Sequence, residues 1–495
     1  MSLPGQSSMN RLRERSAAKP DSLVLALVCV AQFMVVLDIS IVNVALPDMR
    51  NDLHMTQSGL GWVLNAYTLT FAGFLLLGGR AADLFGRKRL FLIGLATFSL
   101  TSLIGGLAQN GTELIAARAV QGLGGAILSP ATLTILTTTF TDPKSRTRAL
   151  GLWSAVAAAG GATGVIAGGV LTDLLSWRWI LFVNVPIGIV VIAISRWAVP
   201  ESRLEGERPT LDWAGALTIT GSLVAIVYGV VSTDRHAWSS TLVMTSLAVG
   251  VALMAAFILI ESKHPHPLVP LRLFRSRGLT GANIVMVLLG SAMFAAFFFL
   301  SQYMQDVHGY SPLATGFAFL PMPLAIIVGT QVSSRLVSRI GPRMLLAVGT
   351  LISAVGMFSL SGLTVHSSYL LHIGISGAVF TFGAGLSFVP VTLSATTGVD
   401  PHDAGLASGL INTTRQIGGS VGLAALLTIA SSRAQSLAPE GAGVAETGGF
   451  TLAFATASGL LVVAALVSLV VLPRKVPVRG LAPAVADVAD EPAVA

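Results

Sequence analysis

One carboxylate lies deep in an apolar stretch of the chain, where an ionised side chain is costly. The chain carries 23 aspartates and glutamates, and we expect all but one in loops, tails or helix ends. Asp38 instead lies well inside the apolar run 23–47. A charged group within a membrane span is expensive, so its presence indicates a function such as proton transfer or binding of a cationic substrate.

Arg118 is the basic residue best placed to meet Asp38. It is the only base deep in an expected helix of the first half, 112–139. With 23–47 running outward and 112–139 running inward, the two residues lie at depths that agree within roughly 6 Å. In the functional interpretation, Asp38 takes up and releases a proton and Arg118 tunes its proton affinity. The alternative is a permanent structural ion pair.

The composition defines the class of protein. Of the 495 residues, 53% are hydrophobic and only 11% are charged, whereas soluble proteins carry about 25% charge. Apolar runs of roughly 20 residues, enough to cross a bilayer, recur throughout. We therefore predict an all-α polytopic membrane protein with fourteen spans. They are about 23–47, 58–78, 90–108, 112–139, 148–170, 178–198, 213–231, 241–260, 279–303, 312–334, 343–363, 368–394, 405–430 and 449–472.

The basic residues predict the orientation of these spans. Of the 30 lysines and arginines, 24 fall on the same side as the N-terminus and 4 on the other side. Such an asymmetry follows the positive-inside rule. It predicts an inner-membrane protein with both termini cytoplasmic, including an N-terminal tail at 1–22 and a disordered tail at 473–495. The net charge of +7 is then a topology signal, so no nucleic-acid partner is expected.

A repeated turn predicts the domain organisation. Segments 80–90 and 335–345 are short basic turns with one glycine each, 255 residues apart. The eight intervening helices fit two six-helix bundles with two extra central helices, and internal repetition is typical of transporters. We expect an N-terminal bundle at 23–198, a linker with two extra spans at 199–278, and a C-terminal bundle at 279–472.

These features resemble the major facilitator superfamily and, within it, the fourteen-helix drug:proton antiporters, from about 23 to 472. The motifs that carry the resemblance are 37–47, with Ser40 where threonine is common; 79–89; Leu114, Arg118, Gln121, Gly122, Gly124 and Gly125; Trp177 to Ile180 and Asn184 to Gly188; Pro267, Leu268 and 271–275; and 403–409. The resemblance implies the major facilitator fold, with a cavity between two bundles.

The resemblance also implies a cytoplasmic latch that holds the outward-open state. Its residues here are Gly79, Asp83, Gly86, Arg87 and Lys88. Aspartate pairs with arginine or caps a helix, and glycine permits the tight turn. The alternative for the basic cluster is a topology anchor without a gating role.

Glycines of the fifth span have the spacing that lets helices pack closely. They are Gly160, Gly164, Gly168 and Gly169, of which the last three are also candidates for conformational gating. Val165 stands where the antiporter motif usually has proline. A symporter or importer of the same fold therefore remains an alternative.

Polar and aromatic side chains inside the spans are candidates for a substrate cavity. They are Gln32, Asn43, Tyr67, Asn283, Phe297, Gln302, Phe382, Asn412 and Arg415. Hydrogen bonding between helices explains any single polar member equally well. Arg415 has no evident acidic partner, so it either snorkels to the inner surface or binds an anionic or carbonyl-bearing substrate.

The expected function is proton-coupled export of amphipathic organic compounds or drugs by alternating access. The chain lacks a phosphate-cradling loop that ends in Gly-Lys-Ser/Thr, so the proton gradient is the expected energy source and no cofactor is expected. The pair His264 and His266 is not expected to bind metal. A membrane-embedded sensor or enzyme is the alternative from another class, but it would need a cluster of catalytic residues. Expected partners are a small organic substrate, protons and lipid, with a monomeric chain.

Overall fold

The chain folds into a bundle of long helices. The computed structural model describes residues 21–202, 211–233, 236–400 and 403–473, so most of the two predicted tails lies outside the described residues. Within the described part, 14 helices are long and apolar enough to cross a membrane, as the sequence predicted. The helices are α2 (Asp21–Asp52), α3 (Gln57–Phe85), α4 (Arg87–Gly106), α5 (Gly111–Thr139), α6 (Pro143–Leu174), α7 (Trp179–Phe182), α8 (Asn184–Ala198), α9 (Trp213–Ser232), α10 (Thr241–Lys263), α11 (Arg277–Gln302), α12 (Pro312–Ala318), α13 (Pro321–Ile340), α14 (Pro342–Leu360), α15 (Ser376–Thr396), α16 (Ala404–Leu437) and α17 (Ala442–Val470).

Short irregular helices extend several of these spans. The π-helical turns η2 (Tyr303–Val307) and η3 (Tyr369–Ile375) follow α11 and precede α15. The 3₁₀ turns η1 (Leu271–Arg275) and η4 (Ala438–Glu440) lie before α11 and after α16. Most long helices also run past the predicted apolar limits, because helical hydrogen bonding continues beyond the roughly 20 residues that a bilayer core requires.

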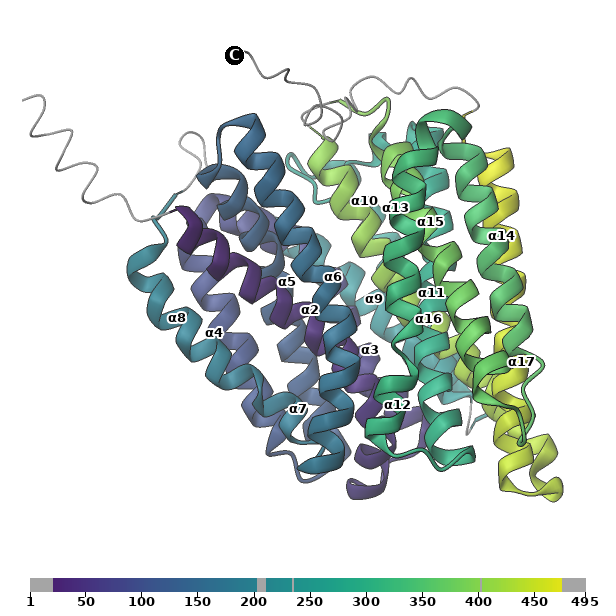
Figure 1. Ribbon diagram of the computed structural model, residues 1–495. Helices are drawn as coiled ribbons and strands as arrows, with labels where there is room; N and C mark the ends of the chain where they lie inside the picture. The colour runs from purple at the N-terminus through teal and green to yellow at the C-terminus, as the bar shows by residue number, and fades with distance from the viewer. Residues whose placement is uncertain (1–20, 203–210, 234–235, 401–402, 474–495) are drawn as a thin grey trace, which may run out of the picture.

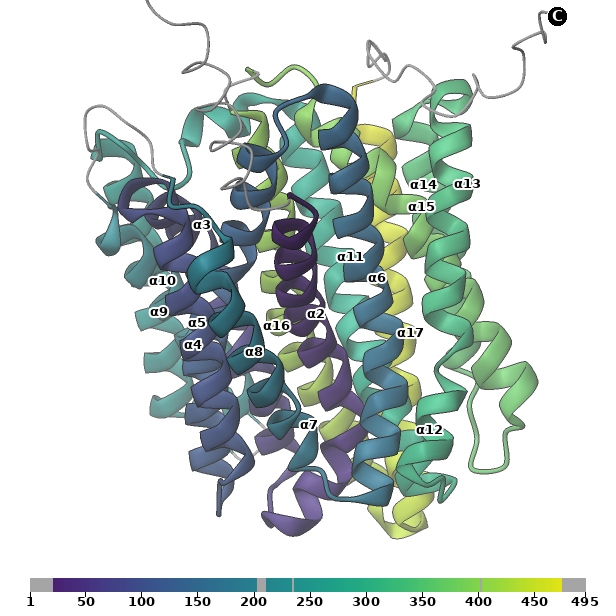
Figure 2. The ribbon, with the colours of Figure 1, turned by 60° about the vertical axis from the view of Figure 1, so that its left-hand side comes forward.

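The helices form two bundles joined by an extra pair. Helices α2 to α8 pack among themselves, as do α11 to α17. The pair α9 and α10 packs together, and α9 contacts both α3 of the first bundle and α16 of the second. We call the face where α2 begins and α17 ends the terminal face, at the top of Figures 1 and 2, and the other end the distal face.

The two repeated basic turns adopt the same backbone conformation. Gly86 joins α3 to α4 with φ 108° and ψ 124°, and Gly341 joins α13 to α14 with φ 85° and ψ 152°. Positive φ is readily adopted only by glycine, so each turn requires it. The shared conformation indicates that the two bundles are repeats of one structural unit.

The sixth and tenth predicted spans are interrupted. The sixth breaks at Val183 into α7 and α8, and the tenth breaks between α12 and α13. Pro186 near the start of α8 and Pro321 at the start of α13 lack the N–H that a continuous helix would use. The first break has a consequence for the site, because it places Asn184 at the start of α8.

Contacts between the bundles close the distal face. Arg50 at the end of α2 makes a 2.8 Å ion pair with Asp306 in η2. Gln57 of α3 donates a hydrogen bond to Gln302 of α11. The side chain of Ser301 donates to the carbonyl oxygen of Asn43 at 2.6 Å. These contacts hold α2 and α3 of the first bundle against α11 of the second.

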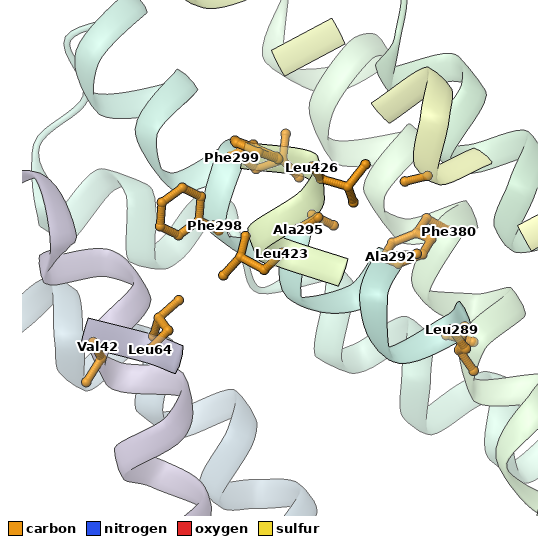
Figure 3. Close-up of a cluster of buried hydrophobic side chains, with 14 of the residues drawn as sticks. Val42, Leu64, Leu289, Ala292, Ala295, Phe298, Phe299, Phe380, Leu423 and Leu426 are labelled. Carbon is orange, nitrogen blue, oxygen red and sulfur yellow. The ribbon is translucent and has the colours of Figure 1, made fainter. Parts of the chain in front are cut away.

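Apolar packing accompanies these polar contacts. One buried cluster contains Val42 and Leu64 from the first bundle together with Phe298 and Leu423 from the second. Figure 3 shows the two groups on facing helices. Close packing of these side chains adds van der Waals contacts across the two bundles, so the cluster stabilises the contact between them.

Close contact of α6 with α12 completes the distal closure. A Cβ atom added to Gly169 would lie 2.6 Å from the carbonyl oxygen of Pro312. A Cβ atom added to Gly316 would lie 2.8 Å from the carbonyl oxygen of Val165. The helices approach this closely only because these positions carry no side chain.

We predict that Gly169→Val opens the distal face, because the added side chain collides with the backbone of α12. Spin labels at Asn51→Cys and His366→Cys, with Cys29→Ala, would report the distance between the bundles at this face by electron–electron double resonance. The expected result is a shift toward longer distances. Gly151→Val is the matched control, since a Cβ there meets nothing within 4 Å. Identical distance distributions for the two variants would contradict the prediction.

Candidate functional site

Asp38 and Arg118 form a buried ion pair between α2 and α5. The carboxylate oxygen Oδ2 of Asp38 lies 2.5 Å from a terminal guanidinium nitrogen of Arg118. The two side chains are 0% and 1% exposed, respectively. The structure thus brings together the two residues that the sequence singled out, at a place where neither charge is hydrated. Such burial is sustained only when every charge has partners.

Polar side chains from three further positions complete the shell of the pair. Gln121 donates from Nε2 to Oδ1 of Asp38 at 2.8 Å, and Asn184 donates from Nδ2 to the same oxygen at 3.0 Å. Both amides also donate to the hydroxyl of Ser102, at 3.3 and 3.0 Å. The carboxylate therefore accepts hydrogen bonds from one charged donor, Arg118, and from two neutral amide donors.

Arg118 is held by the same network. It donates to the amide oxygen of Gln121 at 2.7 Å and, from Nε, to the carbonyl oxygen of Val63 at 3.3 Å. Its guanidinium lies 4.4 Å from the centre of the Tyr67 ring, within the range of a cation–π contact. Gln121 thus bridges acid and base. The resemblance marked Gln121 and Asn184 as motif residues, but sequence reasoning gave neither a role.

Glycines of α6 bring that helix against the backbone of α2 beside Asp38. A Cβ atom added to Gly160 would lie 3.0 Å from the carbonyl oxygen of Phe33. At Gly164 it would lie 2.9 Å from the carbonyl oxygen of Leu37, and at Gly168 it would lie 2.6 Å from that of Ile41. Gly164 and Gly168 therefore pack within the first bundle, whereas Gly169 contacts the second. Any role of these glycines in gating must act through these contacts.

A large cavity lies between the bundles. Its volume is about 1650 Å³, larger than the roughly 300–1,000 Å³ typical of small-molecule sites. Its wall is mostly apolar, and its deep part includes Arg118 and Arg415. At the terminal face it is lined by the loop of His264 and His266 between α10 and η1, and by Asp403. The cavity thus reaches the terminal face, while the distal face is closed.

The structure divides the predicted cavity residues into two groups. Those that line the cavity are Gln32, Asn43, Tyr67, Phe297, Asn412 and Arg415. The others make different contacts. Asn283 accepts a hydrogen bond from Thr414 between α11 and α16, Gln302 takes part in the distal closure, and Phe382 packs in a small apolar cluster with Val337, Leu345 and Leu386. For Asn283 and Gln302, the alternative explanation, hydrogen bonding between helices, is thus the one that the structure shows.

The predicted latch residues lie at the terminal face. Asp83 near the end of α3 pairs with Arg87 at the start of α4 at 2.7 Å, and Gly79 and Asp83 line the cavity. Among the described residues, no ion pair joins Asp83 to the second bundle. Lys88 donates from Nζ to the carbonyl oxygen of Arg196. The basic run is therefore engaged within the first bundle in this conformation.

Sequence reasoning missed Glu201, which holds the start of α4. Its two carboxylate oxygens accept from the backbone N–H groups of Lys88 and Arg89 at 3.1 and 3.2 Å. A carboxylate is favoured at a helix N-terminus by the free N–H groups and the helix dipole. No local signal could have found it, because more than a hundred residues separate Glu201 from this turn.

Two buried carboxylates of the extra helices were also missed. Asp212 accepts from the backbone N–H of Gly215 at 2.7 Å and so caps α9, while Glu261 of α10 accepts from that of Val269 at 3.1 Å. Both residues are nearly fully buried, at 1% and 3% exposure. The sequence placed them at helix ends, and the packing of Glu261 against both the loop after α10 and the start of α9 is decided only by the tertiary structure.

Two repeated bundles around a cavity that opens at one face, with an ion pair buried beside it, define the architecture of a membrane transporter. The chain belongs to the Major Facilitator Superfamily, whose family model matches residues 28–423. The predicted family is therefore confirmed.

Relatives and solved structures agree with this assignment. The chain is 45% identical over 435 residues to the cephamycin export protein of Amycolatopsis lactamdurans, covering 87% of this chain and 89% of that protein. It is 39% identical over 457 residues to a puromycin resistance protein of Streptomyces alboniger, covering 90% of each. A bacterial homologue of the human lysosomal transporter Spinster, crystallised in an inward-facing conformation, matches with a TM-score of 0.66 at 17% identity, covering 91% of this chain and 96% of that one. That last likeness concerns the fold alone.

We predict that Arg118→Met destabilises the protein by about 3–5 kcal/mol, because it leaves the Asp38 carboxylate buried without its counter-charge. The double variant Asp38→Asn, Arg118→Met should lose less stability than the single variant, since no unpaired charge remains. Unfolding in mixed micelles, followed by circular dichroism, would measure the differences. Arg433→Met is the control, because Arg433 is exposed and makes none of the five ion pairs found among the described residues, so its loss leaves no charge buried without a partner. Equal losses for the single and double variants would show that the pair is not coupled.

Proposed function

We propose that the protein exports amphipathic organic compounds across the cytoplasmic membrane in exchange for protons, by alternating access. The observation that carries the proposal is the buried Asp38 carboxylate, whose partner Arg118 forms part of the cavity wall. Asp38 is fully buried and is not among the residues that line the cavity, whereas its partner Arg118 is. A proton thus reaches Asp38 only when Arg118 moves, and a neutral Asp38 holds Arg118 less strongly. Protonation and the shape of the cavity wall are coupled in this way.

The relatives support export as the direction. The first is named as a cephamycin export protein, and another, 34% identical over 420 residues, is a tetracenomycin C resistance and export protein of Streptomyces glaucescens. A mostly apolar cavity of about 1650 Å³ is large enough to hold a drug-sized organic compound. We infer that the substrate is a small amphipathic molecule, that the proton gradient supplies the energy, and that Val165 in place of proline does not reverse the direction.

The proposed orientation places the terminal face in the cytoplasm. The distribution of basic residues, 24 on that side and 4 on the other, supports it. The conformation described above is then inward-open, with substrate entering from the cytoplasm and the distal closure facing outward. Asp83 is proposed to change partners when the terminal face closes, so that the latch forms only in the outward-open state.

We predict that Asp38→Asn abolishes proton release on addition of substrate to everted membrane vesicles, because the amide cannot carry the proton. Uncoupled exchange of substrate should persist, since the cavity wall is retained. Asp142→Asn, in which an exposed helix cap is replaced by another good cap, should behave as wild type. Normal proton release by Asp38→Asn would refute the proton site. A wild type that confers tolerance to no compound and releases no protons would refute export.

We predict that Asp83→Asn favours the inward-open state several-fold, because it removes the charge with which the latch would hold the outward-open state. An impermeant maleimide applied from the cytoplasmic side would label a cysteine introduced at Thr134 in the cavity wall, with Cys29→Ala. The labelling rate should rise in Asp83→Asn and not in Asp142→Asn. Equal rates in Asp83→Asn and in the parent protein would mean that Asp83 is not a latch.

A further inference from the structure

Arg415 is a cation in the cavity wall that makes no ion pair with any residue the structure describes. It lies on α16, eleven residues from the start of a 34-residue helix, which is about 16 Å at 1.5 Å per residue. Its Nε atom is buried and has no hydrogen-bond partner. Among the described residues, each of the five ion pairs is made by other arginines. Arg118, the other guanidinium of the deep cavity, is neutralised by Asp38.

The carboxylates of the cavity wall lie at the terminal face, whereas Arg415 lies deeper in the cavity. Each of these carboxylates lies near the end of its helix at the terminal face; they are Asp83, Glu261 and Asp403. Asp83 pairs with Arg87, Asp403 pairs with Arg272, and Glu261 accepts from a backbone N–H group. The uncompensated charge deep in the cavity is therefore positive.

An unpaired guanidinium at this depth is unfavourable unless a ligand supplies the missing charge. Ionised groups within membrane proteins are costly, and those that are kept face a pathway or cavity and bind a partner there. The Nε atom of Arg415 is buried and lacks a hydrogen-bond partner among the described residues. The geometry of a guanidinium suits a carboxylate, sulfonate or phosphate, which it binds with two parallel hydrogen bonds.

The neighbours of Arg415 form the rest of a binding site. Gln416 is 2% exposed and lines the cavity, and its Nε2 donor has no partner. Asn412, one turn earlier, also lines the cavity. One turn later, a Cβ atom added to Gly419 would lie 2.6 Å from the ring of Phe294, which also lines the cavity. One helix face thus presents free donors next to an aromatic ring, a combination that fits a compound with one anionic group and an apolar body.

We propose that Arg415 binds the anionic group of the transported compound, so that the preferred substrates are amphipathic organic anions. The inference rests on the proposed function, since it assigns the substrate class of that same cavity. Gln416 supplies a second donor, and Phe294 packs against the apolar body. Arg415 serves as a binding residue, whereas Asp38 serves as the proton site.

Equilibrium binding to dansylglycine and its neutral analogue dansylglycinamide tests this assignment, because the two dyes differ in the carboxylate alone. The purified protein in nanodiscs would be titrated with each dye, with empty nanodiscs as the blank. Because the carboxylate would form charge-assisted hydrogen bonds with Arg415, we expect the dissociation constant of dansylglycine to be at least about tenfold lower than that of dansylglycinamide. Arg415→Gln should abolish this preference, and Arg415→Lys should retain part of it. Arg339→Gln is the charge-matched control, because Arg339 is exposed near the end of α13 and does not line the cavity, so it should leave the preference intact.

Every other outcome overturns the inference. Equal affinity of the wild type for the two dyes, no binding of dansylglycine, or a preference that survives in Arg415→Gln would show that Arg415 does not select anions. An equal loss of the preference in Arg339→Gln would show that the net positive charge of the protein, and no specific site, selects the anion. The wild-type comparison decides even if a variant fails to fold. Because binding is measured without a proton gradient, failure here is distinct from the failure of proton-coupled export, which the vesicle experiment detects.

Discussion

The burial of an ion pair within an apolar bundle is the constraint on which the first half of the structure depends. Asp38 and Arg118 are removed from water, so each needs partners within the protein, and four helices supply them. Gln121 binds both members of the pair, and Asn184 reaches Asp38 because the sixth span breaks just before it. The cost of an unpaired charge at this position favours the arrangement of α2, α3, α5 and α8 that supplies these partners.

Helix α2 joins the parts of the site that must act together. Along its length it carries Asp38, the cavity residue Asn43 and the distal ion-pair residue Arg50. Its backbone lies directly against the glycines of α6, and α6 in turn contacts α12 of the second bundle through Gly169. A change in the charge of Asp38 therefore acts on a helix that also forms the cavity wall and the closure. Close packing makes such elements switch between discrete arrangements and prevents gradual deformation.

The sequence predicted most of the fold because the membrane restricts the solutions. Backbone groups within the bilayer must pair internally, so each long apolar run becomes a helix. Glycine at 86 and 341, with basic residues on either side, indicated the repeat, and the structure gives both glycines positive φ. The pairing of Asp38 with Arg118 could also be predicted, since charges at similar depths in an apolar medium have few alternatives. Helix breaks at prolines were not predicted, because the apolar pattern continues across them.

By itself, the sequence determined the class of protein, the number of spans, the repeat and the charged pair, because each depends on composition or on spacing along a helix. Only the tertiary structure decided which face is closed and which polar side chains reach the cavity. Asn283 and Arg415 lie on facing helices and look alike as polar residues in apolar spans. The first is used in a hydrogen bond between helices, whereas the second faces the cavity. That difference depends on how the helices are rotated against one another, which no single helix encodes.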